Sequence, residues 1–151
     1  MAAPIRLSVP GALRYRALAV RIVAEAARLV SQSARSDPDD PLATDVRDPF
    51  DTAVVSAFAE IFNNVVRHAY EHASGSIDIA ISPADHELLI ELSDRGAPFD
   101  IAAVAPLPAD LDETTLPEGG MGIHIARTML DEMTYVPGPP NRWRLRKTRR
   151  S

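Results

Sequence analysis

The chain has 151 residues, of which 46% are hydrophobic and 25% charged, and it contains no cysteine. This length predicts one domain over residues 1–151, with a single sizeable core. The lack of cysteine excludes disulfides and thiolate metal sites. No apolar run reaches about 18 residues, and the first twenty residues do not read as a signal peptide. We therefore expect a cytoplasmic protein with no membrane association.

The net charge of −5 is unevenly distributed along the chain. Residues 142–150 hold six basic residues and no acidic ones, which leaves 10 basic and 21 acidic residues elsewhere. An acidic body disfavours direct binding to nucleic acid or to anionic lipid, and it suits a basic protein partner. Residues 147–151 are expected to form a basic tail.

The N-terminal part predicts a strand and then a helix. Apolar and polar residues alternate over residues 5–9, and Pro10 and Gly11 end this strand. A helix is predicted over residues 12–31. Its apolar stripe comprises Leu13, Ala17, Val20, Val23 or Ala24, Ala27 and Val30. On another face, arginines at positions 14, 21 and 28 are either solvated cations or a partner-docking face. Residues 32–49 contain three prolines and read as a linker.

A second helix is predicted from Asp48 and Pro49 to about residue 72, with Asp48 as its N-cap. Its buried stripe comprises Phe50, Val54, Ala57, Phe58, Ile61, Val65 and Ala69. Glu60, Asn64 and His68 are spaced at i, i+4 and i+8, so they form one polar stripe. This stripe is either a solvated face or a functional site, because unpaired burial costs about 1–3 kcal/mol for each neutral group.

The second half of the chain predicts a hairpin, a long loop, a helix and two further strands. The hairpin pairs residues 77–81 with 88–92, and its second strand leads into Asp94. Residues 97–118 are expected to form a lid loop. The helix is predicted from Gly119 and Gly120 through Met133, and strands are predicted over 134–136 and 142–146. The buried side of this helix is predicted to comprise Ile125, Met129, Leu130 and Met133.

The last predicted strand has two unlike faces. Trp143 and Leu145 point one way, while the arginines at positions 142, 144 and 146 point the other and read as a solvated sheet edge. Taken together, the elements follow the order β-α-α-β-β-α-β-β. This order predicts an α+β fold built as a two-layer α/β sandwich.

Three motifs follow one another in the chain. They are Glu60-x-x-x-Asn64, Asp94-x-Gly96 and Gly119-Gly120-x-Gly122. In this order they resemble the ATP-binding Bergerat fold, the histidine kinase-like ATPase fold shared by gyrase, Hsp90, MutL and sensor histidine kinases. The short chain and the His-Ala-Tyr sequence at 68–70 resemble most closely one branch, the bacterial anti-sigma factors that are also serine-protein kinases. The resemblance covers roughly residues 4–147 and implies a five-stranded mixed sheet with helices on one face.

The resemblance also implies roles for the residues of the first two motifs. Glu60 would be the general base, and Asn64 would offer a carbonyl oxygen to Mg²⁺, which prefers oxygen ligands. Asp94 would accept a hydrogen bond from the amino group of adenine, with Gly96 leaving room for the ring. His68 would lie near the phosphates or the lid. A zinc site at His68 is disfavoured because the sequence supplies no third ligand.

The third motif implies a cradle for the phosphates of ATP. Glycines allow close approach of the backbone, and a helix N-terminus offers unpaired N–H groups. The expected cradle comprises Gly119, Gly120, Met121, Gly122 and Ile123. Two positions depart from the pattern of the family. Pro98 replaces a glycine, and Asn141 stands where many relatives have a threonine near the adenine. Asn141 either substitutes as a polar partner or makes no contact.

As a function, the resemblance implies an ATP- and Mg²⁺-dependent serine/threonine kinase in a partner-switching system. Such a protein holds a sigma factor and phosphorylates a small anti-anti-sigma protein. A nucleotide-dependent binding module without phosphotransfer is the first alternative, and a histidine-kinase catalytic domain is the second. The chain lacks a recognisable phosphoacceptor helix pair, which disfavours the second alternative. Whether the protein forms a homodimer stays open.

Overall fold

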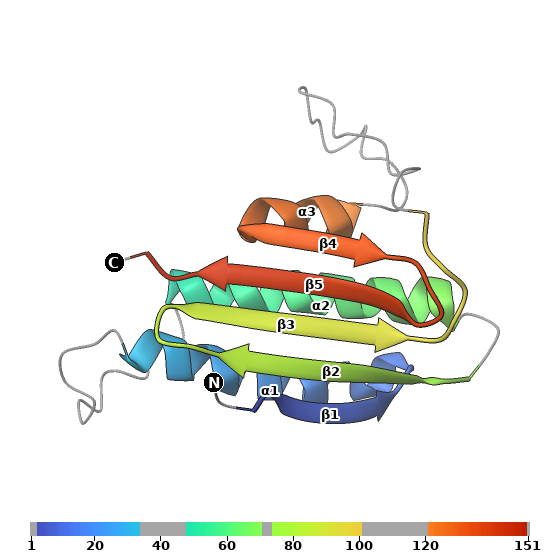
Figure 1. The fold of residues 1–151 in the computed structure, drawn as a ribbon, viewed down its shortest axis with the longest axis horizontal. Helices are drawn as coiled ribbons and strands as arrows, with labels where there is room; N and C mark the ends of the chain where they lie inside the picture. Colours follow the sequence, from blue (N-terminus) through green and yellow to red (C-terminus); the bar gives the residue numbers. More distant parts are fainter. Residues whose placement is uncertain (1–2, 34–47, 71–73, 101–120, 151) are drawn as a thin grey trace, which may run out of the picture.

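The computed structural model describes residues 3–33, 48–70, 74–100 and 121–150 (Figure 1). The elements are β1 (Ile5–Pro10), a 3₁₀ turn (Leu13–Tyr15), α1 (Arg16–Ser33), α2 (Pro49–Ala69), β2 (Ser76–Pro83), β3 (Glu87–Asp94), α3 (Met121–Met129), β4 (Glu132–Val136) and β5 (Asn141–Thr148). Most of the predicted linker and of the predicted lid lies outside the described residues. None of the helices described for this chain is both long and apolar enough to span a bilayer.

In the described part of the chain, five strands form one sheet in the order β1-β2-β3-β5-β4. Every neighbouring pair is antiparallel, so the expectation of a mixed sheet is wrong. The reason lies in the placement of β5. The crossover through α3 leaves β4 parallel to β3, but the final hairpin returns β5 into the gap between them. The arginines of β5 therefore project from an interior strand, and the expectation of a sheet edge is also wrong.

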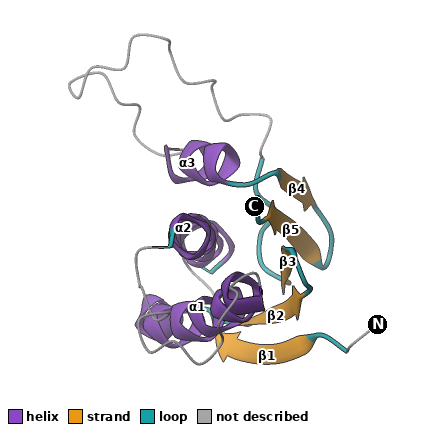
Figure 2. Cartoon of the chain, turned by 90° about the vertical axis from the view of Figure 1, so that its left-hand side faces the viewer, coloured by secondary structure: helices purple, strands orange, loops and turns teal. Residues whose placement is uncertain are grey.

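The three helices cover one face of the sheet, as Figure 2 shows, and the other face is open. This arrangement confirms the predicted α+β sandwich. The whole predicted stripe of α2 is buried, together with Phe62. From the sheet side, the isoleucines of β2 and the apolar residues of β3 and β5 complete the core. α2 lies between α1 and α3 and packs against both, so its side chains can reach either neighbour.

The buried face of α1 is displaced from its predicted position at the N-terminal end. Val23, Ala27 and Val30 are buried as predicted, but Leu13 is 60% exposed and Ala17 is exposed as well. The chain first makes the 3₁₀ turn and becomes α-helical only at Arg16. Because a 3₁₀ turn has three residues per turn rather than 3.6, it shifts the phase of the side chains that precede the helix.

α3 is shorter than predicted, because it ends at Met129 rather than at Met133. Met133 belongs to β4, where it pairs with Leu145 of β5. The backbone N–H of Asp131 already donates to the carbonyl of Arg146, at 3.0 Å. Met133 fits both the helical spacing from Met129 and the alternation with Tyr135, and the pairing with β5 decides the outcome. The fully buried apolar residues of α3 are Ile123 and Ala126. Of the predicted buried side, Met129, Leu130 and Met133 are partly buried against the core, whereas Ile125 does not belong to it.

The predicted basic tail is anchored to the fold over its described part. Lys147 and Thr148 belong to β5. The backbone N–H of Arg149 donates to the carbonyl of His86 at 2.7 Å, and its guanidinium group donates to the carbonyl of Ser31. The same guanidinium group lies 3.6 Å from a carboxylate oxygen of Asp48. Arg149 therefore ties the end of β5 to the ends of α1 and α2 that face each other.

Candidate nucleotide site

The first and third motifs meet where α2 passes the start of α3. A Cβ atom added to Gly122 would overlap the Oε2 atom of Glu60, so a side chain at this position would have to push the carboxylate aside. The carboxylate of Glu60 thus lies directly against the first turn of α3. The sequence predicted that Gly122 would leave space for phosphate. In the structure, the space in front of this glycine is filled by Glu60.

Asn64 lies one helical turn after Glu60 and carries an unsatisfied polar atom. Its Nδ2 atom is buried and has no hydrogen-bond partner among the described residues. Such an atom costs about 1–3 kcal/mol when it stays unpaired, which favours a partner that binds later. Asn63 differs, because its Oδ1 atom accepts a hydrogen bond from Arg16 at 3.3 Å. Asn64, and not its neighbour, is the amide that is available for a ligand.

His68 completes the polar stripe of α2, and its side chain is exposed. The imidazole ring packs against Phe99, with 4.9 Å between the ring centroids. Phe99 also lies 6.1 Å from Trp143 and 6.3 Å from Tyr135, measured between centroids. His68 therefore contacts the segment that follows the Asp94-x-Gly96 motif. Sequence analysis did not identify Phe99, because a single apolar residue in an irregular segment has no periodicity.

Asp94 lies at the end of β3 and is only 5% exposed. Its Oδ1 atom accepts two hydrogen bonds, one from the backbone N–H of Gly96 at 3.0 Å and one from Nδ2 of Asn141 at 2.9 Å. A carboxylate that accepts a hydrogen bond from the N–H two residues later stabilises a local turn. The two donors together fix the orientation of the Asp94 carboxylate.

The backbone that follows Asp94 is held by two tyrosine hydroxyls from different elements. The N–H of Arg95 donates to the Tyr70 hydroxyl at 3.1 Å, and the N–H of Phe99 donates to the Tyr135 hydroxyl at 2.8 Å. Burial raises the pKa of both tyrosines, and the hydrogen bonds from the two backbone groups partly offset this rise. Both side chains therefore remain neutral and rigidly placed.

Tyr70 itself is seated between two glycines. A Cβ added to Gly11 or to Gly75 would overlap its ring, and the N–H of Gly11 donates to the carbonyl of Gly75 at 2.7 Å. The Tyr70 hydroxyl donates to the carbonyl of Ser76, at 2.8 Å. The tyrosine of the His-Ala-Tyr sequence thus joins the end of α2 to the segments beside β1 and β2. The His-Ala-Tyr motif singled out Tyr70 in the sequence, but only the structure shows what this tyrosine contacts.

Gly96 has a packing role that the sequence did not indicate. A Cβ at this position would meet the carbonyl oxygen and the side chain of Ala69, the last residue of α2. The loop after β3 therefore approaches the helix backbone more closely than any larger residue allows. Room for an adenine ring beside Gly96 stays a prediction.

The phosphate cradle is only partly described. Gly119 and Gly120 lie outside the described residues, and for Met121 the structure gives only its helical backbone. The side chain of Ile123 belongs to the core, so this residue can offer only its backbone to a ligand. Gly122 is the one member of the motif whose surroundings are defined.

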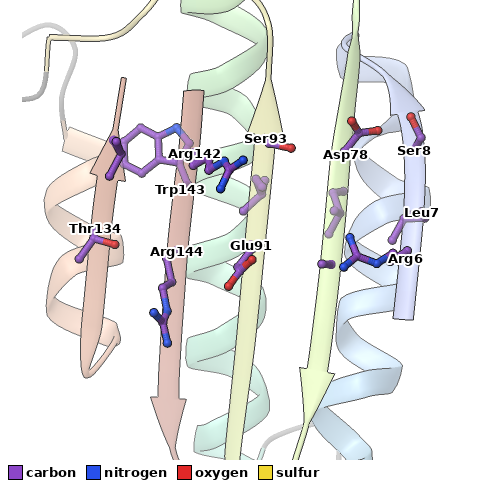
Figure 3. Close-up of a pocket in the computed structure, with 14 residues that line it drawn as sticks. Arg6, Leu7, Ser8, Asp78, Glu91, Ser93, Thr134, Arg142, Trp143 and Arg144 are labelled. Carbon is purple, nitrogen blue, oxygen red and sulfur yellow. The ribbon is translucent and has the colours of Figure 1, made fainter. Parts of the chain in front are cut away.

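A hollow of about 820 Å³ lies on the open face of the sheet (Figure 3). It is lined by side chains of both charges, among them Arg6, Asp78, Glu91, Arg142 and Arg144. The helices that carry Glu60, Asn64 and Gly122 cover the opposite face. The hollow therefore lies on the other side of the sheet from the contact between Glu60 and Gly122.

These features define a class of protein. Residues 10–147 match the family model described as "Histidine kinase-like ATPase domain", and the chain belongs to this family. Curated relatives named "Serine-protein kinase RsbW" come from Bacillus cereus (strain G9842), Bacillus anthracis and Bacillus thuringiensis (strain Al Hakam). Each is 31% identical to this chain over 84 residues, which are 53% of this chain and 52% of the relative. The matched region thus spans about half the length of these relatives.

Proposed function

We propose that this protein is an ATP-dependent serine/threonine protein kinase that also acts as an anti-sigma factor. The observation that carries this proposal is the contact between Glu60 and the first turn of α3. A helix N-terminus attracts phosphate groups, and a carboxylate held beside it is well placed to accept a proton from an attacking hydroxyl. A module that only binds nucleotide does not need this carboxylate.

The described residues support a division of roles. Asp94 accepts a hydrogen bond from the adenine amino group, and the first turn of α3 holds phosphate. Asn64 holds Mg²⁺ through its amide oxygen, and its unsatisfied Nδ2 atom fits a site completed by a ligand. When bound, Mg²⁺ supplies neutralisation of the phosphate charge.

Glu60 takes part in the transfer step itself. It accepts the proton of a serine or threonine hydroxyl as that oxygen forms a bond to the γ-phosphorus. The bond between the γ-phosphorus and the oxygen of ADP breaks in the same step. Phosphoryl transfer depends mainly on positioning and charge neutralisation, so these few groups suffice.

The partners follow from the family branch that the chain resembles. The relatives carry the printed name of serine-protein kinases, which supports a protein as the phosphoryl acceptor. We propose a sigma factor as the binding partner and a small anti-anti-sigma protein as the substrate. Phosphorylation releases this substrate from the kinase and leaves the kinase with the sigma factor. The protein acts in the cytoplasm. The net negative charge of residues 1–141 suits a protein partner rather than nucleic acid.

The test is incubation of the protein with γ-labelled ATP, Mg²⁺ and the anti-anti-sigma-like protein encoded nearest to it. We expect label on serine or threonine of that protein, and none with Glu60→Gln at matched times. Label on histidine instead indicates a histidine kinase. If calorimetry shows that ATP binds while no label is transferred, the protein is a nucleotide-dependent binding module and the kinase proposal fails.

A further inference from the structure

Asn141 is the first residue of β5 and pairs with Asp94 of β3. Its side-chain amide makes three hydrogen bonds within the protein. Its Oδ1 atom accepts a hydrogen bond from the N–H of Gly138 at 2.9 Å. Its Nδ2 atom donates to Oδ1 of Asp94 and to the carbonyl of Gly96, both at 2.9 Å. The residue is 1% exposed. Asn141 is therefore not a direct contact for a base, because both of its amide hydrogens are already donated.

The effect of these bonds is to make the two oxygens of Asp94 unequal. Oδ1 accepts from both Gly96 and Asn141. No donor among the described residues reaches Oδ2, and Oδ2 is not among the buried polar atoms that lack a partner. The small exposed part of Asp94 thus includes an oxygen with free hydrogen-bonding capacity. The carboxylate presents one acceptor to a ligand, not two.

We infer that Asn141 is a specificity-determining positioning residue, which makes the site select adenine over guanine; this inference rests on the proposed nucleotide binding. Adenine offers one amino group beside a ring nitrogen that only accepts. Guanine offers two adjacent donors, and a carboxylate binds these well only through both oxygens. Because Asn141 and Gly96 occupy Oδ1, the two-oxygen contact with guanine is not available, whereas the single contact with adenine is.

Asn141 also has a structural role, since it joins the turn before β5 to the end of β3. A useful test must therefore separate base selection from stability. We propose calorimetric titration of the whole chain with Mg²⁺–ADP and Mg²⁺–GDP, with the melting temperature recorded for each variant. For the unmodified protein we expect ADP to bind at least about tenfold more tightly than GDP, the effect of about one well-made hydrogen bond.

Three substitutions of Asn141 probe the inference. Asn141→Ala removes the donor, and we expect the ratio of GDP to ADP dissociation constants to fall about tenfold. Asn141→Thr retains one donor, so it should keep an intermediate ratio, and it decides the question if the alanine variant does not fold. Asn141→Asp places a second carboxylate beside Asp94. It supplies no amide donor to Asp94, so it should lose the preference.

The matched control is Leu145→Ala, on the same strand and also 1% exposed, which makes no hydrogen bond to Asp94 through its side chain. It should lower the melting temperature and leave the ratio unchanged. An alanine variant with the unmodified ratio overturns the role of Asn141, as does a threonine variant that loses the preference as fully as the aspartate variant, or an unmodified protein that binds both nucleotides equally. If the unmodified protein binds neither nucleotide, the proposed function fails instead.

Discussion

Glu60 and Gly122 lie against each other although 61 residues lie between them in the sequence. A side chain at position 122 would displace the carboxylate of Glu60. This relationship joins the first motif to the third. A change at either residue therefore also affects the other residue.

Glu60→Gln should separate binding from transfer. Glutamine has nearly the same size and still fits beside Gly122, so ATP should bind almost normally. The basic oxygen is lost, and general bases typically contribute about 10²–10⁴-fold in rate. We expect single-turnover phosphorylation to slow by that factor while the dissociation constant of ATP changes little. An unchanged rate would remove the catalytic role of Glu60.

Gly122→Ala should impair transfer through Glu60. The added methyl group must push the carboxylate away from the first turn of α3, so we expect transfer to fall by about tenfold or more. The double variant with Glu60→Gln provides the control, because two changes that act through one group are not additive. If the two losses multiply in full, Gly122 acts on the phosphates directly and our interpretation of the contact is wrong.

Asn64→Ala should weaken nucleotide binding without weakening the fold. Removing the buried Nδ2 atom, which has no described partner, removes a cost of about 1–3 kcal/mol and offsets the packing lost with the side chain, so the variant should be no less stable. Mg²⁺-dependent affinity for ADP should fall at least about tenfold. Asn63→Ala is the matched control. It should lose the contact with Arg16 and retain the affinity.

Tyr70→Phe and Tyr135→Phe should each loosen the loop after Asp94. Each removes a hydroxyl that accepts a backbone hydrogen bond, and such bonds contribute about 0.5–1.5 kcal/mol to stability. We expect a lower melting temperature and weaker binding of ADP. If either variant keeps both the melting temperature and the affinity of the unmodified protein, its hydroxyl does not hold the loop.

The same tyrosines predict how stability changes in alkali. Their pKa values are raised above the usual 10.0 in the folded protein because burial disfavours the phenolate. The folded state therefore keeps protons that the unfolded state loses, and this contribution is complete below pH 10 and lost as the pH rises further. Denaturant titrations between pH 9 and 11 should show a steeper loss for the unmodified protein than for the double phenylalanine variant. Equal slopes would contradict the assignment.

The sequence predicted the parts of this fold that have clear periodicity or a named motif. α2 is one example, since its cap and its whole buried stripe were predicted correctly. The end of α3 was not, because the residues near Met133 suit either a helix or a strand and only the pairing with β5 decides between them. The antiparallel sheet was missed for a similar reason, since strand order depends on which gap the last hairpin fills.

The same distinction applies to the residues of the candidate site, of which some belong to a sequence motif and others do not. Glu60, Asn64 and Asp94 were singled out by their motifs, and their roles toward a ligand stay predictions. Tyr135 and Phe99 were not identified, because each acts through one hydrogen bond or one ring contact to a residue far away in the sequence. Asn141 was noted only as a departure from a pattern, and its three hydrogen bonds required the structure.

The loop after Asp94 is held by groups from α2, β4 and β5, and this has a consequence for the order in which the protein matures. During synthesis, a nascent chain can present Glu60, Asn64 and Asp94 well before β4 and β5 have left the ribosome. Until Tyr135 and Asn141 arrive, the loop after Asp94 is held only by the contacts with Gly96 and Tyr70, and the hydrogen bonds from the last two strands are missing. If Asp94 binds the base as proposed, the site is complete only after the final hairpin has joined the sheet.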